Sequence, residues 1–270
     1  MSTPWIFVCP SSRGIGFALT RHLLRTTSLP ILATTRNPNP ESTKTAILDR
    51  LDAGRNDALS SRLHLVPLDV TDPSSMEAAS RTARELFPPD THHLHMSFAI
   101  PGVLTPEKNA AQVDAAASLA MFRVNTVGPL LLMKYFSAFL PRRSTEMNRD
   151  MLHGLAAHAT WLFMSARVGS IADNKSGGWF SYRASKAAVN SIAKSMDMIL
   201  RTTSGENALA VAYHPGTVKT GLSKGFWGTV PQDKLFSPEY AAERMLSVVN
   251  GLGADQRGMC VDWRGEEIAP

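Results

Sequence analysis

The sequence predicts an α/β fold in which a doubly wound parallel sheet of about seven strands carries helices on both faces. Three observations lead to this prediction. Short apolar runs alternate with longer amphipathic segments along the 270 residues, which is typical of βαβ units. The short runs are apolar on consecutive residues, as in strands that are buried on both faces. No linker rich in Pro, Gly or Ser divides the chain, so we expect a single domain over residues 1–270.

The predicted elements follow one another in order along the chain. Two helix-start signals, Asp72-Pro73 and Ser237-Pro238, precede amphipathic segments. We interpret residues 141–158 as an insertion and residues 217–237, which mix Gly, Lys and aromatic side chains, as a surface flap. The predicted strands are residues 5–9, 30–34, 63–68, 93–100, 160–164, 209–213 and 259–261, and the predicted helices lie near residues 14–26, 74–86, 114–139, 179–202 and 238–250.

The composition excludes several classes of protein. The net charge is +5 and the pI is near 9.4, but the basic excess is spread thinly over the chain. A nucleic-acid or membrane binder more often concentrates such charge. The longest runs without Asp, Glu, Lys or Arg are 16 residues, shorter than the roughly 20 that a spanning helix needs. With two Cys and no basic segment before the first apolar run, we expect a reduced, cytoplasmic protein.

A glycine turn follows the first predicted strand. The strand runs into the sequence from Cys9 to Gly16, CPSSRGIG, and a helix pattern begins directly afterwards. Glycines at a strand-to-helix junction allow close approach of a pyrophosphate, and the helix N-terminus supplies free N–H groups. A tight turn without a ligand explains the same residues, and this alternative stays open on the turn alone.

Two arginines indicate which dinucleotide would bind. Arg13 lies inside the glycine turn, and Arg36 follows the second predicted strand, 20 residues after Gly16. No Asp or Glu occurs between Gly16 and Glu41, although NAD-binding proteins use an acidic residue there. Arginine instead accepts the 2′-phosphate of NADP, so we predict NADP(H). Two solvated surface arginines are the alternative.

Tyr182 and Lys186 form the candidate catalytic pair. They lie four residues apart in a predicted helix, so they project from nearly the same face. An ammonium group beside a phenol favours the phenolate and lowers the phenol pKa. Such a pair exchanges a proton with a carbonyl or alcohol oxygen.

The glycine turn, the Tyr182-x-x-x-Lys186 spacing and Pro215-Gly216 together resemble the short-chain dehydrogenase/reductase family. The resemblance runs from about residue 5 to residue 268 and is closest to the carbonyl-reductase-like branch. It implies a Rossmann-type fold and hydride transfer between NADP(H) and a carbonyl or secondary alcohol. It implies four catalytic roles: Tyr182 as proton donor or acceptor, Lys186 lowering its pKa, Ser165 polarising the carbonyl and Asn125 supporting a water relay. The cofactor contacts that it implies are Ser11, Ser12, Arg13, Gly14, Ile15, Gly16, Arg36, Asp69, Val70, Ala99, Gly102, Tyr182, Lys186, Pro215, Gly216, Val218 and Thr220.

The chain departs from the family pattern at three places. Cys9-Pro10 replaces the first Thr-Gly of the glycine motif, and proline has no N–H. Residues 99–101, Ala-Ile-Pro, stand where the family has Asn-Asn-Ala. Ala166 stands where the family has its catalytic serine, so we assign that role to Ser165 one residue earlier, with Ser170 in reserve. These departures motivate an alternative function: a catalytically weak or inactive NADP-binding sensor or scaffold.

Other features are given less weight. His92, His93 and His95 suggest a metal site, but no Cys pair or carboxylate cluster follows at ligand spacing, so we predict none. Phe226 and Trp227 in the flap fit either a lid over an apolar substrate or a packing surface. As a partner we expect a small-molecule carbonyl or alcohol. The apolar predicted helices 114–139 and 179–202 leave a homodimer or homotetramer open.

Overall fold

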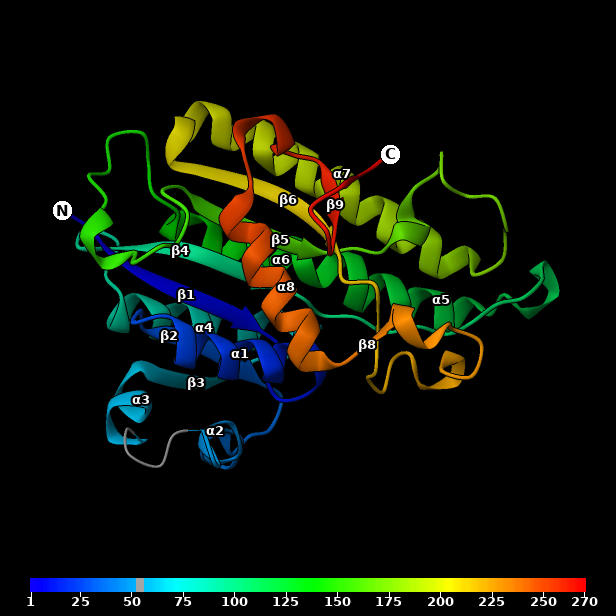
Figure 1. Ribbon diagram of the computed structural model, residues 1–270, viewed down its shortest axis with the longest axis horizontal. Coiled ribbons are helices and arrows are strands. Elements are labelled where there is room, and N and C mark those ends of the chain that lie inside the picture. The colour runs from blue at the N-terminus through cyan, green and yellow to red at the C-terminus, as the bar shows by residue number, and fades with distance from the viewer. Residues whose placement is uncertain (52–55) are drawn as a thin grey trace.

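One sheet runs through the molecule, and its strand order confirms the predicted fold class (Figure 1). The computed structural model describes residues 1–51 and 56–270. The strand order is β10-β9-β6-β5-β4-β1-β2-β3; all neighbours pair in parallel except β10, which is antiparallel to β9. The sheet has eight strands rather than about seven, because the two-residue β10 is too short to leave an apolar run. The strands are β1 (Thr3–Cys9), β2 (Ile31–Thr35), β3 (Leu63–Pro67), β4 (His92–Ala99), β5 (Ala159–Met164), β6 (Ala208–His214), β9 (Cys260–Asp262) and β10 (Glu267–Ile268).

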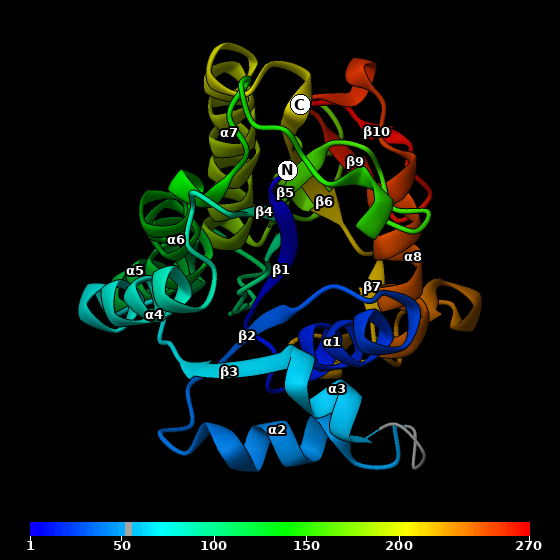
Figure 2. The same ribbon diagram turned by 90° about the vertical axis from the view of Figure 1, so that its left-hand side faces the viewer.

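Helices cover both faces of the sheet. Figure 2 shows α4, α5, α6 and α7 on one side and α1 and α8 on the other. Alternate residues of β1 supply the two cores: Trp5 and Phe7 face the first layer, whereas Ile6 and Val8 face the second. This is why the predicted strands are apolar on consecutive residues. The helices are α1 (Gly14–Thr26), α2 (Pro40–Leu48), α3 (Asn56–Arg62), α4 (Pro73–Leu86), α5 (Ala115–Phe122), α6 (Gly128–Phe136), α7 (Phe180–Thr203) and α8 (Pro238–Gly251).

The long helix predicted near residues 114–139 is interrupted by a π-helical turn. The turn, Arg123–Val127, joins α5 to α6, and such turns often mark functional sites. In the described part of the chain, Ala115–Phe139 is the one helical stretch long and apolar enough to cross a membrane, with mean hydropathy 1.3. It packs against α4 and α7, and core helices of soluble proteins have the same length and composition. These two properties therefore do not assign it to a membrane.

Several elements escape the sequence prediction. Between the second and third strands the chain forms α2 and α3, which bury few side chains and so lack a clear apolar period. The start of α2 does carry a signal, because Asn39 accepts the N–H of Glu41 at 3.2 Å. The predicted flap contains a short parallel pair, β7 (Thr217–Val218) and β8 (Leu235–Phe236).

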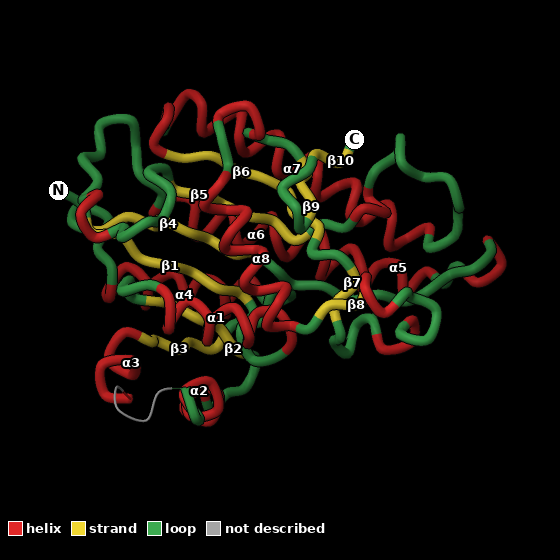
Figure 3. The backbone as a smooth tube through the Cα atoms, viewed as in Figure 1, coloured by secondary structure: helices red, strands yellow, loops and turns green. Residues whose placement is uncertain are grey.

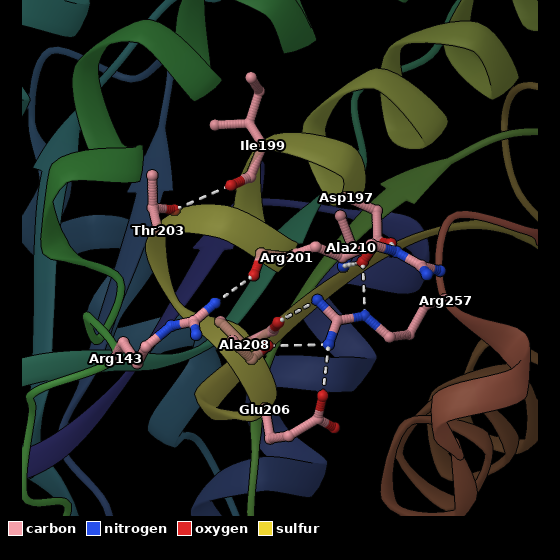
Figure 4. A network of polar contacts seen from close by, with 10 residues as sticks. Arg143, Asp197, Ile199, Arg201, Thr203, Glu206, Ala208, Ala210 and Arg257 are labelled. Carbon is pink, nitrogen blue, oxygen red and sulfur yellow. Dashed lines mark hydrogen bonds and ion pairs between the residues drawn. The ribbon is translucent and has the colours of Figure 1, made fainter.

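A buried ion pair anchors the C-terminal half of α7 (Figure 4). Asp197 is fully buried and accepts hydrogen bonds from Arg257 at 3.2 Å, Arg201 at 2.9 Å and the N–H of Ala210 at 3.2 Å. Arg257 also donates to the carbonyl of Ala208 at 2.9 Å. Removing one partner of such a buried pair typically costs about 3–5 kcal/mol. The network thus fixes α7 to the start of β6 and to the C-terminal segment.

Two of the clustered histidines, His93 and His95, are buried and neutral at pH 7. Nδ1 of His93 lies 3.0 Å from the hydroxyl of Ser2, and Nε2 of His95 lies 3.0 Å from the carbonyl of Ala156. Burial lowers the pKa of His93 to about 4 and that of His95 to about 3. Among the described residues, no three His, Cys, Asp or Glu side chains come together as metal ligands.

These two histidines make the stability depend on pH. Their pKa values in the unfolded chain lie near 6.5, so below that pH the unfolded chain binds protons that the folded protein excludes. The free energy of unfolding should therefore fall as the pH is lowered from 6.5 towards 4, by up to about 1.4 kcal/mol per pH unit for each histidine. Urea unfolding between pH 4 and pH 8 measures this.

A pair of variants isolates the effect. His95→Leu should make the acid side of the stability profile less steep, because His93 and His214 still contribute, whereas His153→Asn, at an exposed position, should leave it unchanged. Identical profiles for the wild type and His95→Leu would contradict the prediction.

Candidate active site

The predicted site residues gather at the carboxyl ends of the parallel strands. The loops that follow β4, β5 and β6 lie at the same end of the sheet as β7 and β8 (Figure 3). In doubly wound sheets ligands bind outside this edge. The site can therefore be built from the segments that meet there.

In the glycine turn, the main chain at Gly16 packs closely against the main-chain carbonyl of Pro10. Gly14 has φ +56, a left-handed conformation that favours glycine. A Cβ on Gly16 would lie 1.9 Å from the carbonyl oxygen of Pro10, so no other residue fits. Arg13, at the N-cap of α1, makes no side-chain cap, which leaves the first N–H groups of the helix for an anion. Ser11 differs from expectation, because its buried hydroxyl donates to the carbonyl of Thr34 at 2.8 Å.

Both predicted phosphate-binding arginines are exposed. Within the described residues, no carboxylate lies within 4 Å of the Arg13 or Arg36 guanidinium. Burial would raise the pKa of Asp69, but hydrogen bonds from Thr71, with the charges of Arg36 and Arg123, lower it overall. Because the charge of Arg36 lowers the pKa of Asp69, these two predicted contacts to the adenosine half of the cofactor lie near each other.

The segment after β6 crosses this edge. The Thr220 side chain lies 3.3 Å from the position that a Cβ on Gly14 would take, and the Leu222 side chain lies 3.4 Å from that of a Cβ on Gly102. Gly102 also faces Lys186, whose Nζ lies 4.0 Å from the position that a Cβ on Gly102 would take. Gly216, with φ +74, leaves room for the Phe236 ring. Of the remaining predicted contacts, Val70 packs near Gly128, Ala99 is fully buried at the end of β4, and Val218 is buried with its carbonyl accepting the Ser223 hydroxyl.

Tyr182 and Lys186 lie on one face in the first two turns of α7. The Lys186 side chain is 1% exposed, and its ammonium donates to the carbonyl of Met164, the last residue of β5, at 2.7 Å. Its Nζ is 5.9 Å from the centre of the Tyr182 ring. Burial raises the pKa of Tyr182 to about 12 and lowers that of Lys186 to about 7.

The direction of the tyrosine shift corrects the sequence prediction. We expected Lys186 to lower the phenol pKa, but desolvation of the phenol dominates and raises it. Tyr182 is therefore neutral around pH 7, which is the form that donates a proton.

Asn125 lies in the π-helical turn and is fully buried. Its carboxamide accepts the N–H of Val103 at 2.8 Å and donates to the Val103 carbonyl at 2.9 Å and to the hydroxyl of Ser185 at 3.1 Å. The side chain thus clamps the segment after β4 to α7. The predicted water relay is not tested by these contacts.

Ser165 does not reach the site. Its hydroxyl donates to Oδ1 of Asn190 at 2.6 Å, while Ala166 packs in the cluster that contains Met121 and Tyr182. Neighbouring residues at a strand end point in different directions, so this geometry favours position 166 over Ser165 for a group beside Tyr182. The role of Ser165 as the group that polarises a carbonyl stays a prediction. Ser170, the reserve, accepts the N–H of Asp173 at 2.9 Å in a local turn.

Sequence reasoning missed Trp179. Its ring centre lies 6.1 Å from that of Tyr182 and 4.9 Å from that of Phe226 in the flap. The residue has φ +50 and follows two glycines with positive φ, so the Gly-Gly pair was the available signal. Apolar side chains around Tyr182 complete the wall: Val103, Leu104, Met121, Ala166 and Val168.

The fold and this site define the chain as a member of a dinucleotide-binding α/β class, and comparison with known proteins identifies the family. No family model matches the chain. It is 33% identical over 156 residues to the C-signal of Myxococcus xanthus, covering 58% of this chain and 80% of the relative. A short chain dehydrogenase of Penicillium aethiopicum is 26% identical over 277 residues, with 98% of both chains covered.

A solved structure agrees with these relatives. The crystal structure of NADPH-bound carbonyl reductase from chicken fatty liver superposes with a TM-score of 0.77, at 26% identity and full coverage of both chains. The chain belongs to the short-chain dehydrogenase/reductase family of oxidoreductases.

Proposed function

We propose that this protein is an NADP(H)-dependent oxidoreductase that transfers a hydride between the nicotinamide and the carbon of a carbonyl or secondary alcohol. One observation carries the proposal. Tyr182 and Lys186 lie buried on one face of α7, and Lys186 adjoins Gly102 at the edge where Thr220 meets Gly14. The helix that carries the predicted proton donor therefore reaches the same edge of the sheet as the predicted nucleotide-binding turn.

The residues at this edge fit a dinucleotide phosphate. The close approach of Gly16 to the Pro10 carbonyl keeps the turn tight, and the uncapped N-terminus of α1 leaves main-chain N–H groups for a phosphate. Arg13 and Arg36 are exposed beside it and would hold the 2′-phosphate of NADP. The NADPH bound by the chicken carbonyl reductase supports this choice. Pro10 supplies no N–H, so the remaining N–H groups of the turn would hold the pyrophosphate.

In the proposed reaction, side chains of this protein supply the proton that the carbonyl oxygen receives. NADPH supplies the hydride when it is bound. Tyr182, neutral because burial raises its pKa, donates its proton to the carbonyl oxygen and so completes the alcohol. The Lys186 ammonium, held by the Met164 carbonyl, stabilises the phenolate that remains. Asn125 keeps the segment at Val103 in register with α7.

The apolar wall indicates the class of substrate. Trp179 borders Tyr182, Phe226 from the flap packs on Trp179, and Ala166 contributes a methyl group where the family has a hydroxyl. Such a lining favours an apolar carbonyl compound and excludes water around the reacting atoms.

Ala166 also favours a second candidate function. A carbonyl that lacks the serine hydrogen bond is less polarised, and one such donor is typically worth about 10²–10³ in rate. A weak or inactive NADP-binding sensor or scaffold of the same fold would tolerate this loss.

Tyr182→Phe tests the proposed function. NADPH oxidation against a panel of apolar aldehydes and ketones should proceed in the wild type and fall at least about 10²-fold in the variant, because the proton donor is lost. Binding of NADPH should be retained. Equal rates in the two proteins would refute the catalytic role, and tight NADPH binding without any turnover would favour the sensor.

Arg36→Ala tests the cofactor. Losing a charge-assisted contact to the 2′-phosphate should raise the Kd for NADPH about tenfold or more and leave that for NADH unchanged. Arg25→Ala, an exposed charge on α1, is the matched control. A similar effect of both variants, or a parallel loss for NADH, would speak against the 2′-phosphate contact. Titration of cofactor fluorescence measures the six dissociation constants of the wild type and the two variants for NADPH and NADH.

Ala166→Ser tests the placement of the missing hydroxyl. A hydroxyl beside Tyr182 should raise kcat for carbonyl reduction by about tenfold. Ser165→Ala should leave kcat nearly unchanged but lower the stability by about 1 kcal/mol, because the partly buried Asn190 loses its partner. A large loss of kcat in Ser165→Ala would instead restore the original assignment. Steady-state kinetics and urea unfolding provide the two readouts.

A further inference from the structure

Glu107 is a buried carboxylate that the proposed mechanism does not use. It lies in the segment between β4 and α5 and is 1% exposed. In the part of the chain that the structure describes, no Lys, Arg or His side chain lies within 4 Å of it. A carboxylate is costly to bury unless hydrogen bonds and favourable dipoles replace water. Its partners therefore indicate its role.

The hydrogen bonds of Glu107 converge on the first turn of α7. One carboxylate oxygen accepts the main-chain N–H of Ser181 at 2.8 Å, and the other accepts the Ser181 hydroxyl at 2.6 Å. The main-chain carbonyl of Glu107 accepts the N–H of Trp179 at 2.6 Å. The N–H of Ser181 has no acceptor within its own helix. Glu107 thus caps α7 from a distant segment, where the helix dipole favours negative charge.

A third segment joins this contact. The hydroxyl of Ser118, in α5, lies 2.6 Å from the hydroxyl of Ser181 and also donates to the carbonyl of Asp114 at 2.7 Å. The segment after β4, α5 and α7 therefore meet at Ser181. A shift of Glu107 would release the start of α7 from the segment after β4 and would leave the Ser118–Ser181 contact as its remaining tie to α5.

The two aromatic groups of the site depend on the same turn. Tyr182 directly follows Ser181. Trp179 adopts φ +50, a conformation that is unfavourable for a residue other than glycine, and its ring contacts Tyr182 and Phe226. The bond from its N–H to Glu107 helps to hold this conformation.

From this geometry we propose that Glu107 is a positioning residue for the reaction. It fixes the first turn of α7, and thereby the direction of the Tyr182 phenol and the Trp179 ring. The inference rests on the proposed function, in which Tyr182 donates the proton. Glu107 touches no residue of the predicted nucleotide-binding turn, and Lys186, a predicted cofactor contact on α7, is held separately by the Met164 carbonyl. Loss of Glu107 should therefore lower kcat and leave cofactor binding nearly unchanged.

Two substitutions separate the hydrogen bonds from the charge. Glu107→Gln keeps the length: its amide oxygen accepts the N–H of Ser181 and its amide nitrogen donates to the Ser181 hydroxyl, which then donates to Ser118. Glu107→Ala removes both contacts. Asp72→Ala is the matched control, since Asp72 caps α4 by accepting the N–H of Ser74 at 2.9 Å.

Steady-state kinetics and NADPH binding are measured on the full-length wild type and the three variants. Glu107→Ala should lower kcat by about tenfold to a hundredfold, as expected for misplacement of a catalytic group by about 1 Å, with an unchanged Kd for NADPH. Glu107→Gln should retain the kcat of the wild type. Asp72→Ala should lose a similar amount of thermal stability and retain its kcat. An equal loss of kcat in the Gln and Ala variants, or in Asp72→Ala, would overturn the inference.

Hydrogen–deuterium exchange of residues 178–183 in the cofactor-free protein gives a second readout. Exchange should accelerate in Glu107→Ala and match the wild type in Glu107→Gln, and unchanged exchange in the Ala variant would overturn the positioning role. Because this readout needs no substrate, it separates failure of the inference from failure of the proposed function. If the wild type reduces no carbonyl while the exchange result holds, the proposed reaction fails and the capping of α7 by Glu107 stands.

Discussion

The hydrogen bond from the Lys186 ammonium to the Met164 carbonyl joins the two elements on which the site depends, α7 and the carboxyl end of β5. An ammonium buried this deeply is stable only where a strong acceptor replaces water, so the bond fixes both the depth and the rotation of the helix. Two further contacts hold α7 at its ends: the Glu107 carboxylate at the first turn and the Asp197–Arg257 pair near the last. With the helix held at three levels, Tyr182 has little freedom relative to the strand ends.

The same burial decides the protonation states. A phenol in water beside an ammonium would ionise more easily, but here both groups are desolvated and each shifts towards its neutral form. Neutral Tyr182 is suited to giving a proton, and Lys186, with a pKa near 7, still carries charge in part of the molecules at neutral pH. The apolar neighbours Ala166 and Met121 therefore influence the chemistry through the dielectric environment rather than through direct contact with a proton.

Local sequence patterns predicted the glycine turn and the Tyr182–Lys186 pair of the candidate site. Gly14 and Gly16 follow from the geometry of one turn, and the Tyr182–Lys186 spacing follows from the period of one helix. The side on which Ser165 projects depends on a single residue at the end of β5, which no periodic pattern resolves. The sign of the Tyr182 shift depends on burial by segments that are far apart in the chain. Glu107 and Ser181 are 74 residues apart, and no local sequence pattern around either residue predicts their contact.

The structure also shows how the segment after β4 is held without the asparagines of the family pattern. Residues 99–101 have no side-chain amide that could form hydrogen bonds with the segment after β4. Two other elements, the π-helical turn and α7, form hydrogen bonds with this segment instead. Asn125, from the π-helical turn, forms hydrogen bonds with the N–H and the carbonyl of Val103. At the start of α7, the N–H of Ser181 donates to the Glu107 carboxylate. The segment is thus fixed by contacts made to it rather than by its own polar side chains. Because these contacts come from the π-helical turn with Asn125 and from the start of α7, the position of the segment after β4 is coupled to that of α7.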